Sequence, residues 1–493
     1  MFLSLLSPVI KLPFETYLFF STFFYYLFLL IVNPSNKIIV VSYFFLFLAL
    51  FIKSKSFEKS ILFTLLASSI VFTGKRYPIQ LLPEGIFPKE IFPQGYFVNL
   101  VITPTHVISF LILLYLGRNL MTVNLFRSGS KLRINLLDVL IVLFYGFKIG
   151  SALIGSKNPQ LSLAAELLTL NGLILYFFIR LVAIKGSGDV WRGLAFLFAG
   201  LIFFETFLGA FQYINKSPLY KNLEFQVNIE YFGNNVDEPG FTYRPIGTFD
   251  HANSLGIWLA SWLCFLFVFI AKYKSQVLRL AFFSGLVLLT LTISRSAWLG
   301  FLSGMFFLLV NFEKYNGLSV KGVVSGLGGY RLLIVPVLIF LSLFVVVPRI
   351  EHSAYSFGAE SGSWYFRQIQ IADGLEIIRI NPVFGVGALM SVLEGLTLDG
   401  YTVAASIPLA VHNWYITLAL NNGLPALFCF TFFVLLSLRN LWSLNLKRNY
   451  ILLAVLAFSI CAFVSGIFQP YLSEETLILL VTLAGNANIT RNT

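Results

Sequence analysis

The chain has 493 residues and a mean hydropathy of +0.84, with 58% apolar and 11% charged residues. This composition excludes a disordered chain, a disulfide scaffold and most soluble enzymes. A net charge of +12 would suggest a nucleic-acid partner in a soluble protein, but apolar runs long enough to cross a bilayer dominate this chain. All three cysteines lie in such runs, so neither a disulfide framework nor a zinc site is indicated. The chain is predicted to be an all-α polytopic membrane protein.

The apolar runs between polar breaks predict about 12 to 14 transmembrane helices. Several runs are shorter than the roughly 20 residues that a span needs, and the last is the weakest. In chain order the predicted spans lie near 15–33, 38–53, 58–74, 98–117, 135–154, 161–184, 191–214, 252–273, 277–293, 295–312, 330–348, 412–437, 449–468 and 472–485.

Basic residues orient these helices. If the N-terminus is cytoplasmic, each of six cytoplasmic connections carries three or more Lys or Arg residues, which is the bias that the positive-inside rule requires. Most of the positive charge is therefore an insertion signal facing anionic lipid, and no nucleic-acid partner is expected. The same orientation places three polar stretches on the outer face, at 75–97, 215–251 and 349–411. We expect a multi-pass protein of the cytoplasmic (inner) membrane with its N-terminus in the cytoplasm.

The longest outer stretch, 349–411, contains an amphipathic helix over Ser363–Arg379. Ser361 or Ser363 can cap its start, and Pro382 stops it. Its expected apolar face consists of Trp364, Ile371, Leu375 and Ile378, and its polar residues are Arg367, Asp373 and Glu376. Such a helix would lie on the outer membrane surface or roof a cavity between spans.

Three polar clusters stand where an outer stretch meets a span, and the first is Arg244-Pro-Ile-Gly-Thr-Phe-Asp-His-Ala-Asn253. Gly247 and Thr248 allow a turn, and Asn253 or Ser254 can cap the following helix. A helix N-terminus with an arginine nearby is a sound anion site. The alternative is an ordinary loop-to-helix cap whose arginine reaches the membrane interface.

The other two clusters are Ser294-Arg295-Ser296 and His412-Asn413. An arginine forced towards lipid costs about 2.5–3.5 kcal/mol, so Arg295 should face protein, water or an anion, or else anchor the helix at the interface. His412 is the best candidate for a general base on the outer side, because an unperturbed histidine titrates near pH 6.5. The alternative is an interfacial residue that only forms hydrogen bonds.

Several familiar motifs are absent from the sequence. It has no Asp-x-Asp pair to hold a metal with a nucleotide sugar, no P-loop, no dinucleotide fingerprint and no His-Glu-x-x-His zinc motif, so we expect no metal or cofactor. Asp138, Glu166 and Glu205 lie in or near spans, and Lys148 can pair with one of them. A buried structural pair is favoured over a proton relay.

Taken together, the clusters resemble the O-antigen ligase and polymerase superfamily of bacterial envelope glycosyltransferases. The resemblance covers roughly residues 200–437, and its motifs are Arg244 to Asn253, Ser294-Arg295-Ser296, Asn381-Pro382-Val-Phe-Gly385-Val-Gly387 and His412 onward. The family's signature is His followed by Asn, Ser or Gln, nine residues, and Gly-x-x-Gly, Thr or Tyr. Here Gly423-Leu-Pro-Ala426 closes the pattern, and the final alanine departs from it. That departure bears on the ligase assignment and leaves the broader superfamily standing.

The resemblance implies a GT-C-like, metal-independent glycosyltransferase that uses a polyprenyl-diphosphate-linked glycan as donor and a glycan or lipid as acceptor. It implies that Arg244 and Arg295 hold the diphosphate and that His412 acts near the acceptor hydroxyl. Two guanidinium groups would stabilise the negative charge of the departing diphosphate. The further substrate-binding candidates are Arg367, Asn253 and Asn413.

The sequence thus predicts N-terminal transmembrane helices over 1–200, an O-antigen ligase-like core over 201–437 with both long outer loops, and C-terminal transmembrane helices over 438–493. Ligase and polymerase share this layout and are not separated. A solute transporter or polysaccharide flippase is the alternative, but such proteins show internal repeats and midplane charges, whereas the polar clusters here gather on one face. A non-catalytic scaffold would leave Arg244, Arg295 and His412 apart.

Overall fold

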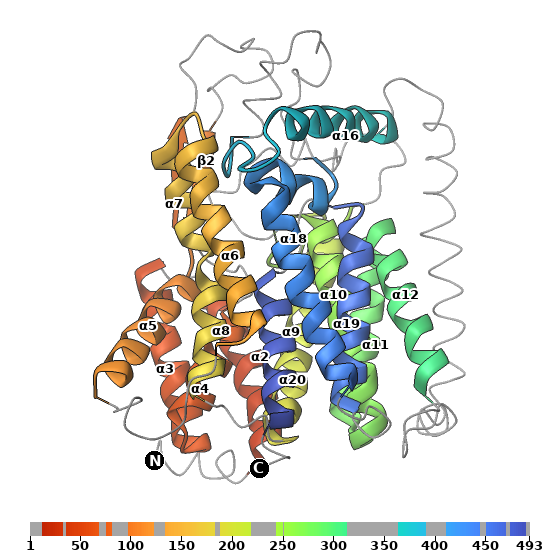
Figure 1. The fold of residues 1–493 in the computed structure, drawn as a ribbon. Coiled ribbons are helices and arrows are strands. Elements are labelled where there is room, and N and C mark those ends of the chain that lie inside the picture. The colour runs from red at the N-terminus through yellow and green to blue at the C-terminus, as the bar shows by residue number, and fades with distance from the viewer. Residues whose placement is uncertain are drawn as a thin grey trace.

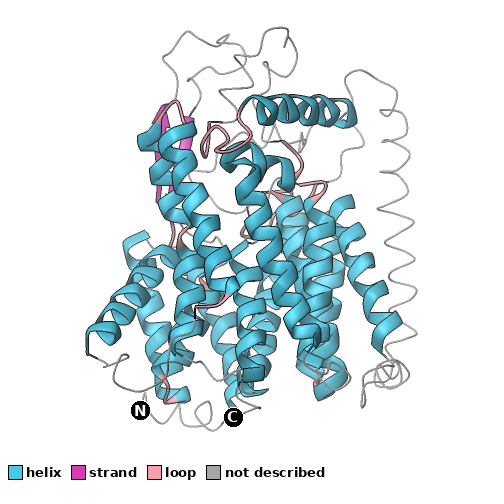
Figure 2. Cartoon of the chain, viewed as in Figure 1, coloured by secondary structure: helices cyan, strands magenta, loops and turns pink. Residues whose placement is uncertain are grey.

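The computed structural model shows an all-α polytopic membrane protein, as the composition predicts (Figures 1 and 2). It describes residues 12–32, 36–68, 75–80, 97–122, 134–182, 188–217, 243–249, 251–312, 363–390, 411–443, 450–469 and 474–489. Most of the outer stretches 215–251 and 349–411, and the predicted span at 330–348, lie outside these ranges.

The elements of the first part of the chain include one antiparallel strand pair, in which Lys75 is opposite Ile102. They are α2 (Phe14–Val32), α3 (Asn36–Ser54), α4 (Phe57–Ala67), β1 (Lys75–Gln80), β2 (Phe97–Ile102), α5 (Pro104–Thr122), α6 (Leu136–Gly150), a π-helical turn η1 (Ser151–Gly155), α7 (Pro159–Thr169), α8 (Asn171–Val182) and α9 (Gly188–Asn215).

In the described ranges of the second part, all the regular elements are helices. Its helices are α10 (Ala252–Tyr273), α11 (Gln276–Leu291), α12 (Arg295–Phe312), α16 (Ser363–Ile380), α18 (Trp414–Ser443), α19 (Tyr450–Gly466) and α20 (Glu474–Ile489).

Most of these helices run along a common axis and form a bundle, with α9 and α10 packed at its centre (Figure 1). Aromatic side chains join the central helices: the Trp262 ring of α10 stacks on Phe198 of α9, and its centroid lies 5.0 Å from that of Phe458 of α19. Within the described ranges, six helical segments are long and apolar enough to cross a membrane, and four shorter helices are also apolar. Such all-round apolar helices are typical of membrane-embedded bundles.

Span boundaries match the prediction best where polar residues flank an apolar run on both sides. The predicted spans 252–273 and 295–312 coincide with α10 and α12. Two others differ. The run 98–117 begins as strand β2, and its helix starts only at Pro104, because proline suits a first helical turn and keeps the residue before it extended. The run 161–184 is divided into α7 and α8 around Leu170, although the combined segment Pro159–Arg180 is long and apolar enough to cross a membrane, as predicted.

Helix α16 lies crosswise at one end of the bundle, close to the start of α18 (Figure 1). The sequence predicted this helix and its end before Pro382 correctly. The predicted apolar face was wrong in part: Leu375 is 53% exposed, whereas the polar residues Gln370 and Asp373 are buried. The buried face of α16 is therefore partly polar, which apolar periodicity cannot reveal.

Candidate active site

The loop that precedes α10 is held in place by two polar side chains of α9. The Glu205 carboxylate is fully buried and accepts hydrogen bonds from the backbone N–H and the hydroxyl of Thr248. The Gln212 carboxamide accepts the N–H of Gly247 at 2.8 Å and donates to the Gly247 carbonyl at 2.9 Å. Gly247 has φ +58°, and a Cβ there would overlap the Glu205 carboxylate, so this turn requires glycine.

This loop presents Arg244 and His251 at the end of the bundle where α16 lies. Arg244 is buried; its Nε donates to the Thr292 carbonyl at 2.7 Å, and its Nη2 donates to Oδ1 of Asn253. His251, rather than the predicted Asn253 or Ser254, is the N-cap of α10. Its Nδ1 accepts the Asn253 N–H at 3.0 Å, and an imidazole nitrogen can replace the usual oxygen because the cap needs only an acceptor.

The turn between α11 and α12 positions Arg295. Ile293 has φ +49° and is buried, an unfavourable conformation for a β-branched residue that the surrounding packing must sustain. This turn directs the Thr292 carbonyl to Arg244 and places Ser294 before the helix, where its hydroxyl accepts the Ala297 N–H. Arg295 is the first residue of α12 and is exposed.

Helix α16 brings two further side chains to this end of the bundle. Arg367 lies one turn before Gln370, and both occur near the buried face. Nδ1 of His412 lies 3.0 Å from Oε1 of Gln370. Because a carboxamide oxygen only accepts hydrogen bonds, Nδ1 of His412 is the donor and its Nε2 carries the lone pair.

A break in α18 explains the spacing between His412 and the glycine of the family signature. Gly423 interrupts α18 with φ +85° and ψ 162°, and a Cβ there would overlap the Val383 carbonyl. The first part of α18, which follows His412 directly, thus ends at residue 422. Pro425 leaves one carbonyl of that first part without its helical N–H donor.

The turn that follows α16 satisfies the backbone groups exposed by this break. The Val386 and Gly387 N–H groups donate to the carbonyls of Leu420 and Asn421 at 3.0 and 2.9 Å. In the opposite direction, the Leu424 N–H donates to the Pro382 carbonyl at 2.9 Å. The motif Asn381 to Gly387 and the signature that begins at His412 therefore dock onto each other through their backbones.

Electrostatic interactions connect the side chains at this end of the bundle. Burial lowers the pKa of His251 to about 4, and the positive charges that lower it further come from Arg244, His412 and Arg367. Burial and then the charge of Arg367 lower the pKa of His412 to about 4. Burial and then Arg295 lower the pKa of Arg367. The structure thus gathers these cationic and titratable groups, from four separate segments, into one region.

The predicted site residues are accounted for as follows. Arg244 contacts Asn253 directly, and Arg295, Arg367 and His412 belong to the same electrostatic group. Asn413 uses Oδ1 to accept the Ile416 N–H, so it caps α18, and its substrate contact stays a prediction.

Sequence reasoning did not single out Gln212, Gln370 or His251 for these contacts. Gln212 and Gln370 contact residues far away in the sequence, and His251 replaces a more familiar capping residue. Within the described part of the chain, no three His, Cys, Asp or Glu residues form a group able to hold a metal.

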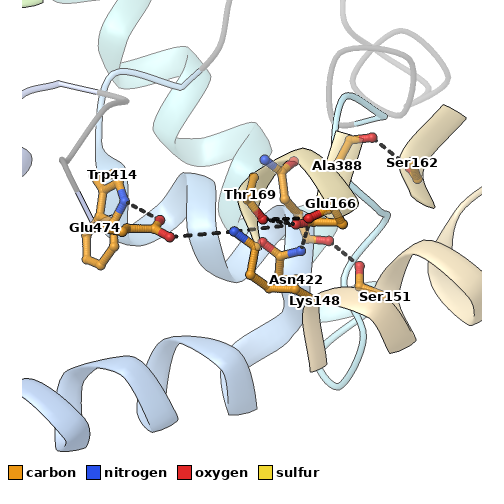
Figure 3. A network of polar contacts seen from close by, with 10 residues as sticks. Lys148, Ser151, Ser162, Glu166, Thr169, Ala388, Trp414, Asn422 and Glu474 are labelled. Atoms are coloured by element: carbon orange, nitrogen blue, oxygen red, sulfur yellow. Dashed lines mark hydrogen bonds and ion pairs between the residues drawn. The ribbon is translucent and has the colours of Figure 1, made fainter. Parts of the chain in front are cut away.

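A second polar region, the Lys148 cluster, lies inside the bundle (Figure 3). Lys148 on α6 is 3.4 Å from the Glu166 carboxylate of α7 and 3.5 Å from the Glu474 carboxylate of α20. Asn422 donates to Glu166 at 2.6 Å, and the indole of Trp414 donates to Glu474 at 3.2 Å. The expected partner of Lys148 is thus Glu166, with Glu474 as a second partner.

The other two buried carboxylates considered with Lys148 have different partners. Asp138 accepts from Tyr176 and Arg180 and forms a capping box with Asn135. Glu205 holds the loop before α10. Each carboxylate that the sequence placed in or near a span is therefore engaged in a structural contact.

Residues 280–431 match the family model described as O-antigen ligase. This match supports the O-antigen ligase superfamily for this chain. The matched O-antigen ligase region runs from α11 into the second part of α18, and includes Arg295, α16, His412 and the break at Gly423. Ala426, which departs from the family signature, is fully buried. No curated protein matches the chain.

Proposed function

We propose that this protein transfers a glycan from a polyprenyl-diphosphate carrier to an acceptor at the outer face of the cytoplasmic membrane. The family match supports a membrane glycosyltransferase of the O-antigen ligase or polymerase type. The observation that carries the finer proposal is the gathering of Arg244, Arg295, Arg367 and His412 at one end of the bundle.

The charge balance of this site favours a polyanionic ligand. Within the described ranges, neither Arg295 nor Arg367 forms a hydrogen bond or an ion pair with another residue. Like charges held close together destabilise one another, and the diphosphate of a lipid carrier would neutralise them. Guanidinium groups suit this role because their planar donors match two phosphate oxygens at once.

The reaction that we propose breaks the bond between the anomeric carbon and the diphosphate oxygen. The acceptor hydroxyl oxygen forms the new bond to that carbon, and polyprenyl diphosphate leaves with the bonding electrons. Arg295 and Arg367 stabilise the charge that develops on the leaving group. Nε2 of His412 takes the proton of the acceptor hydroxyl, which its tautomer permits because Gln370 accepts from Nδ1.

The position of the site agrees with a lipid-linked substrate. In Figure 1, α16 and the start of α18 lie at one end of the bundle, and α2 begins at the other. With the N-terminus cytoplasmic, as the basic residues predict, the site faces the outer leaflet. A lipid-linked donor can reach a site at the outer leaflet from within the membrane, so the enzyme needs no nucleotide-binding domain to hold its donor.

Reconstitution in liposomes with a polyprenyl-diphosphate oligosaccharide tests this proposal. Transfer should release polyprenyl diphosphate and give either a longer lipid-linked glycan, as a polymerase would, or a glycan on a new lipid anchor, as a ligase would. His412→Ala should lower kcat much more than it changes the KM for the donor. Movement of intact donor between leaflets without any new glycosidic bond would support a flippase and overturn the proposal.

A further inference from the structure

We infer that Gln370 is the positioning residue of His412: it fixes the imidazole in the Nδ1-protonated form and thereby keeps Nε2 available as the proton acceptor. This inference rests on the proposed function, because it concerns the base in the same glycosyl transfer. Gln370 lies 42 residues before His412 in the chain, on α16, and only the fold brings the two together.

The contact between these residues is specific. Nδ1 of His412 and Oε1 of Gln370 are 3.0 Å apart, an ordinary length for a hydrogen bond to a carboxamide. Gln370 is 9% exposed, so little water competes for the ring nitrogen. A half-buried histidine such as His412, whose Nδ1 is held by an acceptor, presents its other nitrogen in one defined orientation.

The helix that carries Gln370 is itself fixed against the base. Ile377 and Ile378 of α16 pack with Ala419 and Leu420 of α18 in a common buried cluster. Gly374 allows this close approach, since a Cβ there would lie 2.8 Å from a methyl carbon of Ile416. The carboxamide is therefore held on a rigid platform.

A neutral partner, rather than a carboxylate, gives this base a particular character. A carboxylate next to the ring would stabilise the imidazolium ion and raise the histidine pKa. A carboxamide orients the ring without that effect, and burial and Arg367 lower the pKa of His412. His412 thus stays neutral at neutral pH, even among several arginines, and its Nε2 lone pair is available, while the same lowering of its pKa makes it a weaker base.

The charged and titratable groups around His412 come from each neighbouring segment. Outside α16, these groups are Arg244 and His251 in the loop before α10, and Arg295 at the start of α12. The charge of Arg295 lowers the pKa of Arg367. Those on α16 are Arg367, the buried Asp373, and Glu376, which pairs with the exposed Arg379.

The test compares Gln370→Glu and Gln370→Leu with wild type in the liposome transfer assay, over a range of pH. Gln370→Glu keeps an acceptor for Nδ1 and adds negative charge. It should raise the acidic-limb midpoint of the pH profile by more than about one unit, while kcat at its own optimum stays within a few-fold of wild type. Gln370→Leu removes the acceptor. It should lower kcat about 10- to 100-fold with the KM for the donor nearly unchanged.

The matched control is Gln368 on the same helix, which is exposed. Gln368→Glu and Gln368→Leu change the charge and polarity of α16 equally and should leave kcat and the pH profile unchanged. Equal profiles for wild type and Gln370→Glu, with wild-type kcat in Gln370→Leu, would overturn the positioning role. If wild type itself transfers no glycan, the proposed function fails instead, so the two failures are distinguishable.

Discussion

The Lys148 cluster and the candidate active site treat charge in opposite ways. In the first, one buried lysine lies between the carboxylates of Glu166 and Glu474, and Asn422 and Trp414 donate to those carboxylates. In the second, Arg295 and Arg367 lie close enough to repel each other, and no described carboxylate forms an ion pair with either.

This difference separates a structural cluster from a binding site. A buried ion pair whose members are fully hydrogen-bonded leaves nothing for a ligand to satisfy, and it holds together the helices that contribute to it. Positive charges that the protein does not balance are unfavourable by themselves and become favourable with an anion. Substitutions confined to one region should therefore change either the stability of the protein or glycan transfer.

The largest effect is expected from Lys148→Met. It leaves the two carboxylates of the Lys148 cluster without their cation, which should lower the free energy of unfolding by about 3–5 kcal/mol. Thermal unfolding in detergent measures this loss. Adding Glu166→Gln and Glu474→Gln should recover most of it, and Lys157→Met, at an exposed position, should change it by less than about 0.5 kcal/mol. A stable single mutant would refute the structural role.

Arg295→Ala should lower glycan transfer by about 100- to 1000-fold, because it removes a donor that we propose stabilises charge in the transition state. Since Arg295 is exposed at a helix start, the unfolding temperature should not change. The matched control is Arg379→Ala: this arginine is also exposed but pairs with Glu376, and transfer should stay at the wild-type rate. Full activity in Arg295→Ala would contradict its role.

Arg244→Lys should raise the KM for the donor about tenfold. The guanidinium of Arg244 reaches the Thr292 carbonyl and the Asn253 side chain with different nitrogens, and a single ammonium cannot do both. The loop before α10 should remain folded, because Glu205 and Gln212 hold it independently. An unchanged KM would show that the two contacts do not position a donor-binding group.

The smallest effect concerns pH. His412 must be neutral to accept a proton, and its pKa is lowered to about 4, so kcat/KM should stay level from neutral pH down to about pH 5 and fall as the pH approaches 4. Because folding lowers the pKa values of His412 and His251, the unfolded chain binds more protons than the folded chain between about pH 4 and 6.5. Stability should therefore decrease as the pH falls through that window. An acidic limb centred near 6.5 would show an unperturbed base.

The sequence predicts well what depends on neighbouring residues. The spans at α10 and α12, the helix α16 and its end before Pro382 all follow from apolar runs and local breaks. Arg244, Arg295 and His412 could be proposed as partners because each stands at the outer end of a predicted span. An arginine or a histidine at such a position is unusual enough to be noticed.

What could not be predicted depends on contacts between distant segments. Gln370 and Gln212 are ordinary glutamines in the sequence, and only their burial against His412 and the loop before α10 gives them a role. The inward face of α16 was misassigned at Leu375, because the buried polar residues on that face have partners that periodicity does not reveal.

The docking of the Asn381–Gly387 turn onto α18 restricts how the site can open. The amides of Val386 and Gly387 donate to carbonyls that lack a helical donor at the break in α18. Separating the end of α16 from the first part of α18 would therefore leave these backbone groups without hydrogen-bond partners. Helix α16 and the first part of α18, which follows His412, should thus move together as one rigid unit. Amide hydrogen exchange at Val386 and Gly387 should therefore be among the slowest outside the membrane-crossing helices.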